Sequence, residues 1–198
     1  MNTNLQRAIV LSLLVLLMAA TRSHVFAHFT PVPDATWAAF LIGGFYLRAW
    51  ARRAFPALMA VAVLIDVMVI YSQGMGFSGH YCVSPGYWML IPAHAAMWAA
   101  GHWLRGRHAG AGSGALARLA AVLVPATATC HLFAQGGFYW LSPAVAEPTL
   151  AGWAANYGHW FAPYLAATAM YVAAAAIAQA VSEVVARNAG SVQQHGQR

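Results

Sequence analysis

The sequence predicts an all-α membrane protein with six transmembrane helices and both termini in the cytoplasm. Hydrophobic residues make up 61% of its 198 residues and charged residues only 7%, whereas a soluble domain carries about a quarter charged residues. The apolar residues fall into six segments, each near the ~20 residues that a helix needs to cross a bilayer. The basic residues lie at the ends of these segments. The length suits one domain, so residues 1–198 are expected to form a single six-helix transmembrane domain.

The predicted helices follow one another without an internal repeat. They are residues 7–22, 35–49, 55–71, 86–104, 116–134 and 157–183. The second is short, and Arg48 at its end can extend its side chain toward the membrane interface. The first also fits a signal peptide, because Arg7 precedes an apolar run and the letters VFA precede His28. We favour a retained helix, since six helices place both termini, and the charges near them, on one side.

The arginines predict the orientation of these helices. All ten basic residues are arginines, and a six-helix arrangement puts only Arg22 on the side opposite the others. Arginine and lysine are retained on the cytoplasmic side, so the connections 23–34, 72–85 and 135–157 are expected to face outward. The net charge of +6 does not indicate a nucleic-acid partner, because it belongs to helix ends. The composition of residues 186–198 predicts a disordered cytoplasmic tail.

Four ionisable side chains are predicted to lie in the outer half of the membrane: Asp66, His94, His131 and His159. At 1.5 Å per residue, Asp66 lies roughly 8 Å and His94 roughly 12 Å from the outer ends of their helices. Ionisable groups inside a membrane commonly face a cavity or a partner, so the group predicts a polar pocket open to the outside. Two alternatives stay open: Asp66 pairs with a histidine or hydroxyl to hold helices together, and each histidine alone has a structural role.

Cys82 lies in the outer connection GHYCVSPGYW, between His80 and a turn that starts the fourth helix. A thiolate favours soft or borderline metal centres, and a protonated His80 would lower the pKa of the thiol. Cys130 lies in an apolar run and is expected to be a small core residue. A disulfide between the two stays open, although the chain has no C-x-x-C motif.

Several stretches of the chain resemble the BtuM family, the cobalamin-specific substrate-binding (S) components of energy-coupling-factor (ECF) transporters. They are HFTPVPDATWAAFLIGGFYLR, the third helix with its internal Asp66, YCVSPGYWMLIPAH and GGFYWLS. The resemblance extends from about His24 to the sixth helix. Its most specific parts are the Cys-x-Ser-Pro and Pro-Asp-x-x-Trp elements. It implies an S-component-like bundle of six helices in a bacterial inner membrane, with a corrinoid pocket that faces the periplasm.

The resemblance also implies roles for particular residues. Cys82 would be an axial ligand of the cobalt of cobalamin. From the strong donor character of a thiolate, we further expect Cys82 to hold the corrinoid base-off and to promote loss of a bound cyanide, as the catalytic residue of that step. His28 is a candidate second metal ligand. Candidate pocket residues, chosen by position and type, are His28, Phe29, Trp37, Tyr81, Ser84, Tyr87, Phe138, Tyr139, Asn156 and Tyr157.

The expected partners are cobalamin as the transported ligand, membrane lipid, and either an ECF coupling protein with its ATPases or no partner protein at all. Family members dock through small residues on the first helix, of which only Ala8 and Ser12 are present here. The chain has no Walker motif and is not expected to hydrolyse ATP.

Three rival functions stay open on the sequence. Histidines on several helices also fit a haem-binding electron-transfer protein, with His131 and His159 as ligands. Cys82 and Cys130 fit a membrane thiol oxidoreductase. A purely structural six-helix protein is the third, although it leaves the polar outer half of the membrane without a role.

Overall fold

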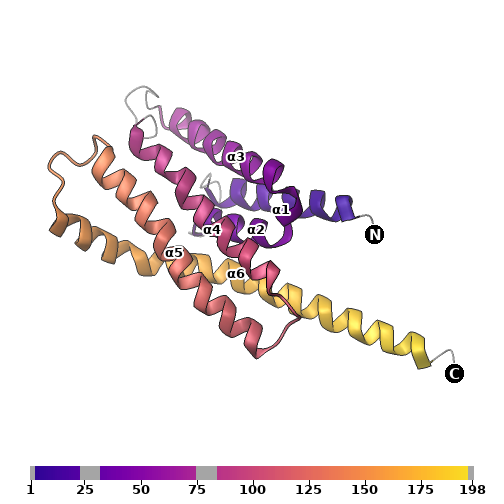
Figure 1. Ribbon diagram of the computed structural model, residues 1–198. Helices are drawn as coiled ribbons and strands as arrows, with labels where there is room; N and C mark the ends of the chain where they lie inside the picture. Colours follow the sequence, from indigo (N-terminus) through magenta and orange to yellow (C-terminus); the bar gives the residue numbers. More distant parts are fainter. Residues whose placement is uncertain (1–2, 23–31, 75–83, 196–198) are drawn as a thin grey trace.

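The computed structural model describes residues 3–22, 32–74 and 84–195, with side chains up to residue 189. Six α-helices and two 3-10 helices make up this part of the chain (Figure 1). Their bounds are α1 Thr3–Arg22, α2 Thr36–Tyr46, η1 Arg48–Trp50, α3 Ala51–Ser72, η4 Pro85–Met89, α4 Leu90–Gly106, α5 Ser113–Leu141 and α6 Leu150–His195. The described ranges contain no strand, so the all-α class is confirmed, and each predicted segment lies mainly within one helix, in the predicted order.

Four helices are long and apolar enough to cross a membrane. They are α1, α3 extended back to Arg48, α5, and α6 as far as Ala189. Their length and composition suggest a membrane protein. Two helices are shorter: α2 has 11 residues, or about 16 Å at 1.5 Å per residue, and α4 has 17. The 5 residues of η4 run directly into α4, so the two together approach the length of a membrane span.

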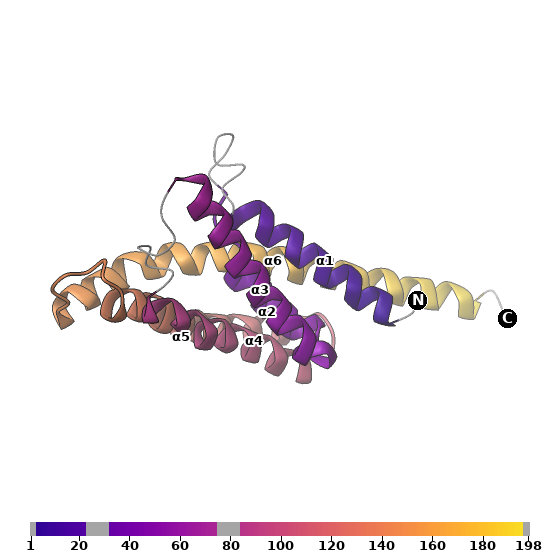
Figure 2. The same cartoon turned by 90° about the horizontal axis from the view of Figure 1, so that it is seen from above.

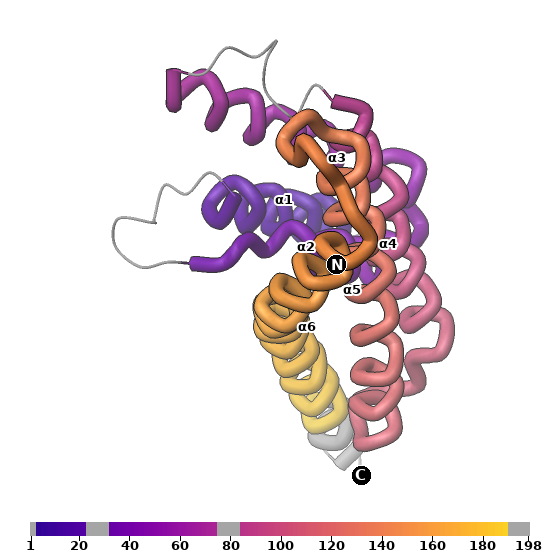
Figure 3. Tube along the Cα trace, turned by 90° about the vertical axis from the view of Figure 1, so that its left-hand side faces the viewer, coloured from indigo at the N-terminus to yellow at the C-terminus, as the bar shows by residue number. Residues whose placement is uncertain are grey.

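The short helix α2 forms the centre of the bundle. All nine residues from Thr36 to Gly44 are buried, and Figure 3 shows the helix between α1 and α4. A helix that is apolar on every side must be surrounded by other helices. The core cluster accordingly includes Phe40 of α2, Met18 of α1, Leu58 of α3 and Met97 of α4.

Glycines let α2 and α4 approach closely. A Cβ atom added to Gly44 would overlap the carbonyl oxygen of Trp98, and one added to Gly101 would overlap the carbonyl oxygen of Leu41. Small residues permit such contact between apolar helices. The alanines Ala95 and Ala99 of α4, by contrast, are exposed.

Helix α6 is much longer than expected. It has 46 residues, or about 69 Å, and Figure 1 shows its C-terminal part extending beyond the other helices. Disorder was predicted from residue 186, but helix continues to His195. The segment ARNAGSVQQH contains no proline, and extending an existing helix is far easier than starting one.

Candidate functional site

A cavity of about 630 Å³ lies where α1, α3 and α5 end and α2, η4 and α6 begin. We call this the Asp66 end of the bundle. Four of the predicted pocket residues line the cavity, together with two of the four predicted intramembrane groups. These are Trp37, Tyr87, Phe138 and Asn156, with Asp66 and His131. The six residues come from five helices and lie together at one end of the bundle.

One wall of the cavity carries an arginine held by two carboxylates. The Arg22 guanidinium donates from Nε and Nη2 to the two oxygens of Asp66, at 2.6 and 2.7 Å. Its Nη1 donates to Asp34 at 2.9 Å, and the Tyr87 hydroxyl donates to Asp66 at 2.7 Å. We call these four residues the Arg22 cluster. Two parallel N–H···O bonds to one carboxylate are among the stronger and more specific polar contacts in proteins.

The sequence carries a signal for this cluster in its few acidic residues. One alternative left open was that Asp66 pairs with a histidine or a hydroxyl, and the Tyr87 hydroxyl fits it. Arg22 was noted only as the exception among the arginines. The chain has just four acidic residues, and three of them, Asp34, Asp66 and Glu147, belong to the side predicted for Arg22. A lone cation near these carboxylates indicates an ion pair.

Another part of the lining is aromatic and surrounds a histidine. The His131 ring lies 4.5 Å from the ring of Tyr157 and 5.4 Å from that of Tyr164, between centroids. Trp37 stacks on Tyr164 at 4.6 Å and lies 5.8 Å from His131. Nε2 of His131 lies 3.1 Å from the carbonyl oxygen of Tyr157. Because a carbonyl only accepts, this nitrogen carries the proton, and Nδ1 of a neutral ring is an acceptor.

Two buried side chains on this wall carry polar atoms without a hydrogen-bond partner in the described part of the chain. They are Nδ1 of His131 and both amide atoms of Gln135. Both residues line the cavity, although His131 is only 1% exposed and Gln135 8%. They are one helical turn apart on α5, so they share a face. Buried polar atoms nearly always have partners, so a small rotation of these side chains toward the cavity would let a polar ligand or water satisfy them.

Gln135 is not among the pocket residues predicted from the sequence, because its side chain carries no charge. Its position four residues after His131, inside an apolar helix, was the available signal.

Two of the other predicted pocket residues have structural contacts instead, and a third is buried. The Tyr157 hydroxyl donates to the Ala128 carbonyl at 2.9 Å and joins α6 to α5. The Tyr139 hydroxyl accepts from the Thr149 amide at 3.3 Å and holds the α5–α6 loop. Ser84 is buried just before η4. None of these three side chains lines the cavity.

The remaining histidines also lie apart from the cavity. His94 stacks on Phe40, with centroids 4.3 Å apart and planes 4° from parallel, and its Nδ1 lies 3.2 Å from the Met59 sulfur. His159 is exposed beside Trp160. His94 therefore packs in the core, and of the predicted histidines that the structure describes only His131 lines the cavity.

Four predicted residues, Cys82, His28, Phe29 and Tyr81, lie outside the described residues. Cys82 is three positions before Pro85, the first residue of η4, and Gly86 and Tyr87 of η4 line the cavity. Cys130 is fully buried in α5 and, within the described residues, unpaired. In the ranges 3–22, 32–74 and 84–195, no three His, Cys, Asp or Glu side chains gather as a metal site would require.

No protein-family model matches the chain, and no curated protein matches it. What the cavity binds must therefore be inferred from its own side chains.

Proposed function

We propose that this membrane protein binds cobalamin at the Asp66 end and serves its uptake across a bacterial inner membrane, with Cys82 as an axial ligand of the cobalt. The observation that carries the proposal is the cavity itself, which has one aromatic wall, one charged wall and unpartnered amide atoms. A corrinoid combines an extended flat ring with many amide side chains, and such a ligand uses both kinds of wall.

The size of the cavity suits part of this ligand. Its 630 Å³ falls within the ~300–1,000 Å³ of pockets for drug-sized molecules, and cobalamin is larger than these. One edge of the corrin would occupy the cavity, beside Trp37 and Gln135. The rest would project beyond the cavity, and Cys82, which lies outside the described residues, would supply the ligand of the cobalt. A single protein ligand is sufficient for cobalt, because the corrin ring itself supplies four nitrogens.

We place this cavity on the periplasmic side of a six-helix S-component-like bundle, with both termini in the cytoplasm. The arginine distribution supports this orientation. Arg48, Arg52, Arg105 and Arg118 lie near the ends of helices away from the Asp66 end, where the positive-inside rule predicts the cytoplasm. Arg22 at the Asp66 end is neutralised by two carboxylates, so it does not oppose that orientation.

Cobalamin with cyanide on cobalt would exchange its axial ligands on binding. The Cys82 thiol loses its proton to water, and the thiolate forms a sulfur–cobalt bond. The benzimidazole nitrogen dissociates from one axial position, which is the base-off state. Because a thiolate is a strong donor, it weakens the bond on the opposite face, and cyanide leaves with the electron pair of its bond to cobalt. Cobalt keeps its oxidation state, so no oxidant or reductant is needed.

The test is the visible spectrum of purified protein incubated with cyanocobalamin and then desalted. Wild type should retain a corrinoid with a shifted, base-off spectrum, whereas Cys82→Ala should not show the shift. Cys130→Ala is the matched control, because Cys130 is buried away from solvent. Loss of the corrinoid from all three proteins would refute cobalamin binding. Retention with identical spectra would refute the role of Cys82, and a Soret band in the purified protein would support haem instead.

Uptake either uses the ATPases of an ECF module or proceeds without any partner protein. On α1, Ser12 is exposed and Ala8 is half-buried, a small surface for docking a coupling protein. We therefore propose that uptake proceeds without the module. Growth on cobalamin in cells that lack ECF ATPases tests this, and dependence on those ATPases would contradict it.

A further inference from the structure

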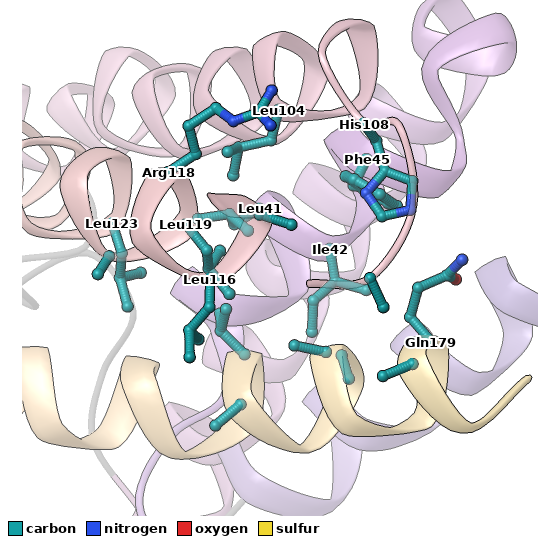
Figure 4. A pocket seen from close by; sticks show the side chains of 18 of the residues that line it. Leu41, Ile42, Phe45, Leu104, His108, Leu116, Arg118, Leu119, Leu123 and Gln179 are labelled. Atoms are coloured by element: carbon teal, nitrogen blue, oxygen red, sulfur yellow. The ribbon is translucent and has the colours of Figure 1, made fainter. Parts of the chain in front are cut away.

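A second cavity, of about 570 Å³, lies near the opposite end of the bundle and has no part in the proposed corrinoid site. Helices α2, α4, α5 and α6 form its walls. Figure 4 shows Leu41 and Ile42 of α2 facing Leu116, Leu119 and Leu123 of α5 across it. Nearly all of its lining is apolar, so water is a poor occupant.

The cavity reaches the surface of the bundle between α5 and α6. Leu116 on α5 and Ile177 on α6 both line it and are 66% and 64% exposed. Figure 2 shows α6 diverging from α5 with distance from the loop that joins them. Both helices are long and apolar enough to cross a membrane. In a bilayer, the molecules that meet such an opening are lipids.

Cationic side chains lie at one edge of the cavity. Arg107 and Arg118 belong to its lining, and Nη1 of Arg118 donates to the Arg107 carbonyl at 2.6 Å. The Arg107 guanidinium lies 3.9 Å from the centre of the Trp103 ring. Arg118 extends along the edge beside Leu104 in Figure 4. These contacts fix two positive charges next to an apolar space.

The nearby carboxylate does not cancel both charges. Glu183 is engaged by His108 at 2.6 Å, by the Ala111 amide at 2.6 Å and by Gln179 at 2.6 Å. Its oxygens therefore bind α6 to the loop after α4.

We propose that this cavity binds an anionic phospholipid, with an acyl chain between α5 and α6 and the headgroup phosphate against Arg107 and Arg118. Basic pockets between transmembrane helices at the cytoplasmic interface are known to hold anionic headgroups. An apolar cavity beside fixed cations matches the two ends of one phospholipid. The inference does not depend on corrinoid binding.

The alanine-rich segment of α6 makes the space. Ala173, Ala176 and Ala180 line the cavity, and their spacing of three and four residues places them on one helical face. Ala174 and Ala178 do not line it. Phenylalanine at Ala176 should fill the cavity, whereas phenylalanine at Ala178 should face away from it. The two variants change the same helix by the same volume.

The experiment is native mass spectrometry of detergent-purified protein titrated with phosphatidylglycerol or phosphatidylcholine. Wild type should retain one phosphatidylglycerol, Ala178→Phe should match it, and Ala176→Phe should lose it. Arg107→Gln and Arg118→Gln should each weaken phosphatidylglycerol binding about fivefold and leave phosphatidylcholine unchanged. Arg52→Gln, an exposed arginine outside the cavity lining, is the control.

Equal retention by Ala176→Phe and Ala178→Phe would overturn the acyl-chain site. Equal binding of the two lipids by wild type would overturn the headgroup contact. Should Ala176→Phe fail to fold, as circular dichroism would reveal, the arginine variants decide the matter, because they alter only the edge of the cavity.

Discussion

Gln135 and Arg22 have opposite roles in the same cavity. Arg22 has four hydrogen-bond contacts within the described residues, to Asp34, Thr36 and both oxygens of Asp66. Gln135 has none for its side-chain amide in that part of the chain. The first is therefore expected to stabilise the fold and the second to contact a ligand, and replacing each should affect a different measurement.

Arg22→Leu should strongly destabilise the protein. The side chains of Arg22 and Asp66 are only 16% and 15% exposed, and removing one partner of a buried pair costs about 3–5 kcal/mol. Thermal unfolding in detergent measures the change. Arg52→Leu, an exposed arginine, is the control, and the double variant Arg22→Leu/Asp66→Leu should recover stability. Equal melting temperatures for Arg22→Leu and Arg52→Leu would show that the Arg22 cluster does not stabilise the fold.

Gln135→Leu should weaken cyanocobalamin binding about tenfold, the effect of one lost hydrogen bond, without lowering stability. Thr127→Val is the control, because Thr127 is also buried with an unpartnered hydroxyl in the described structure but does not line the cavity. Equilibrium titration measures both. Equal affinities would mean that Gln135 does not contact the ligand.

The contact between α2 and α4 depends on glycine rather than on large side chains. At both Gly44 and Gly101, the atom nearest an added Cβ is a backbone carbonyl oxygen, which cannot rotate away. The two helices would have to separate to admit a methyl group.

Gly101→Ala should therefore lower the free energy of unfolding by about 1–3 kcal/mol, as overpacking does. Gly158→Ala is the matched control, since nothing lies within 4 Å of its added Cβ and alanine favours a helix over glycine by about 1 kcal/mol. Chemical or thermal unfolding, followed by the loss of helix, measures the stability of both variants. A Gly101→Ala variant as stable as Gly158→Ala would contradict the close approach.

In the whole molecule, the two cavities lie toward opposite ends of one helical bundle. The orientation proposed for it puts the α5–α6 loop outside and residues 107–112 inside. Ala146→Cys and Gly112→Cys, each in a background of Cys82→Ala and Cys130→Ala, test this. A membrane-impermeant maleimide should label position 146 in intact cells and position 112 only after lysis. The reverse labelling pattern would show that the bundle has the opposite orientation in the membrane.

Features of the fold that depend on residues close together in the chain could be predicted from the sequence. Hydropathy located each helix, and residue type placed Trp37, Tyr87, Phe138 and Asn156 at one cavity. The sequence was not sufficient where contacts join distant residues. Arg22 and Asp66 are 44 positions apart, and no local pattern reveals which carboxylate a cation meets. The glycine contacts likewise depend on how two helices cross.

X-ray absorption at the cobalt K edge would test most directly whether Cys82 binds the metal of cobalamin. Wild type loaded with cyanocobalamin should show one sulfur in the first coordination shell of cobalt and no cyanide carbon. Cys82→Ser should show only nitrogen, oxygen or carbon neighbours, and Cys130→Ser should match wild type. A first shell without sulfur in loaded wild-type protein would contradict the proposed coordination.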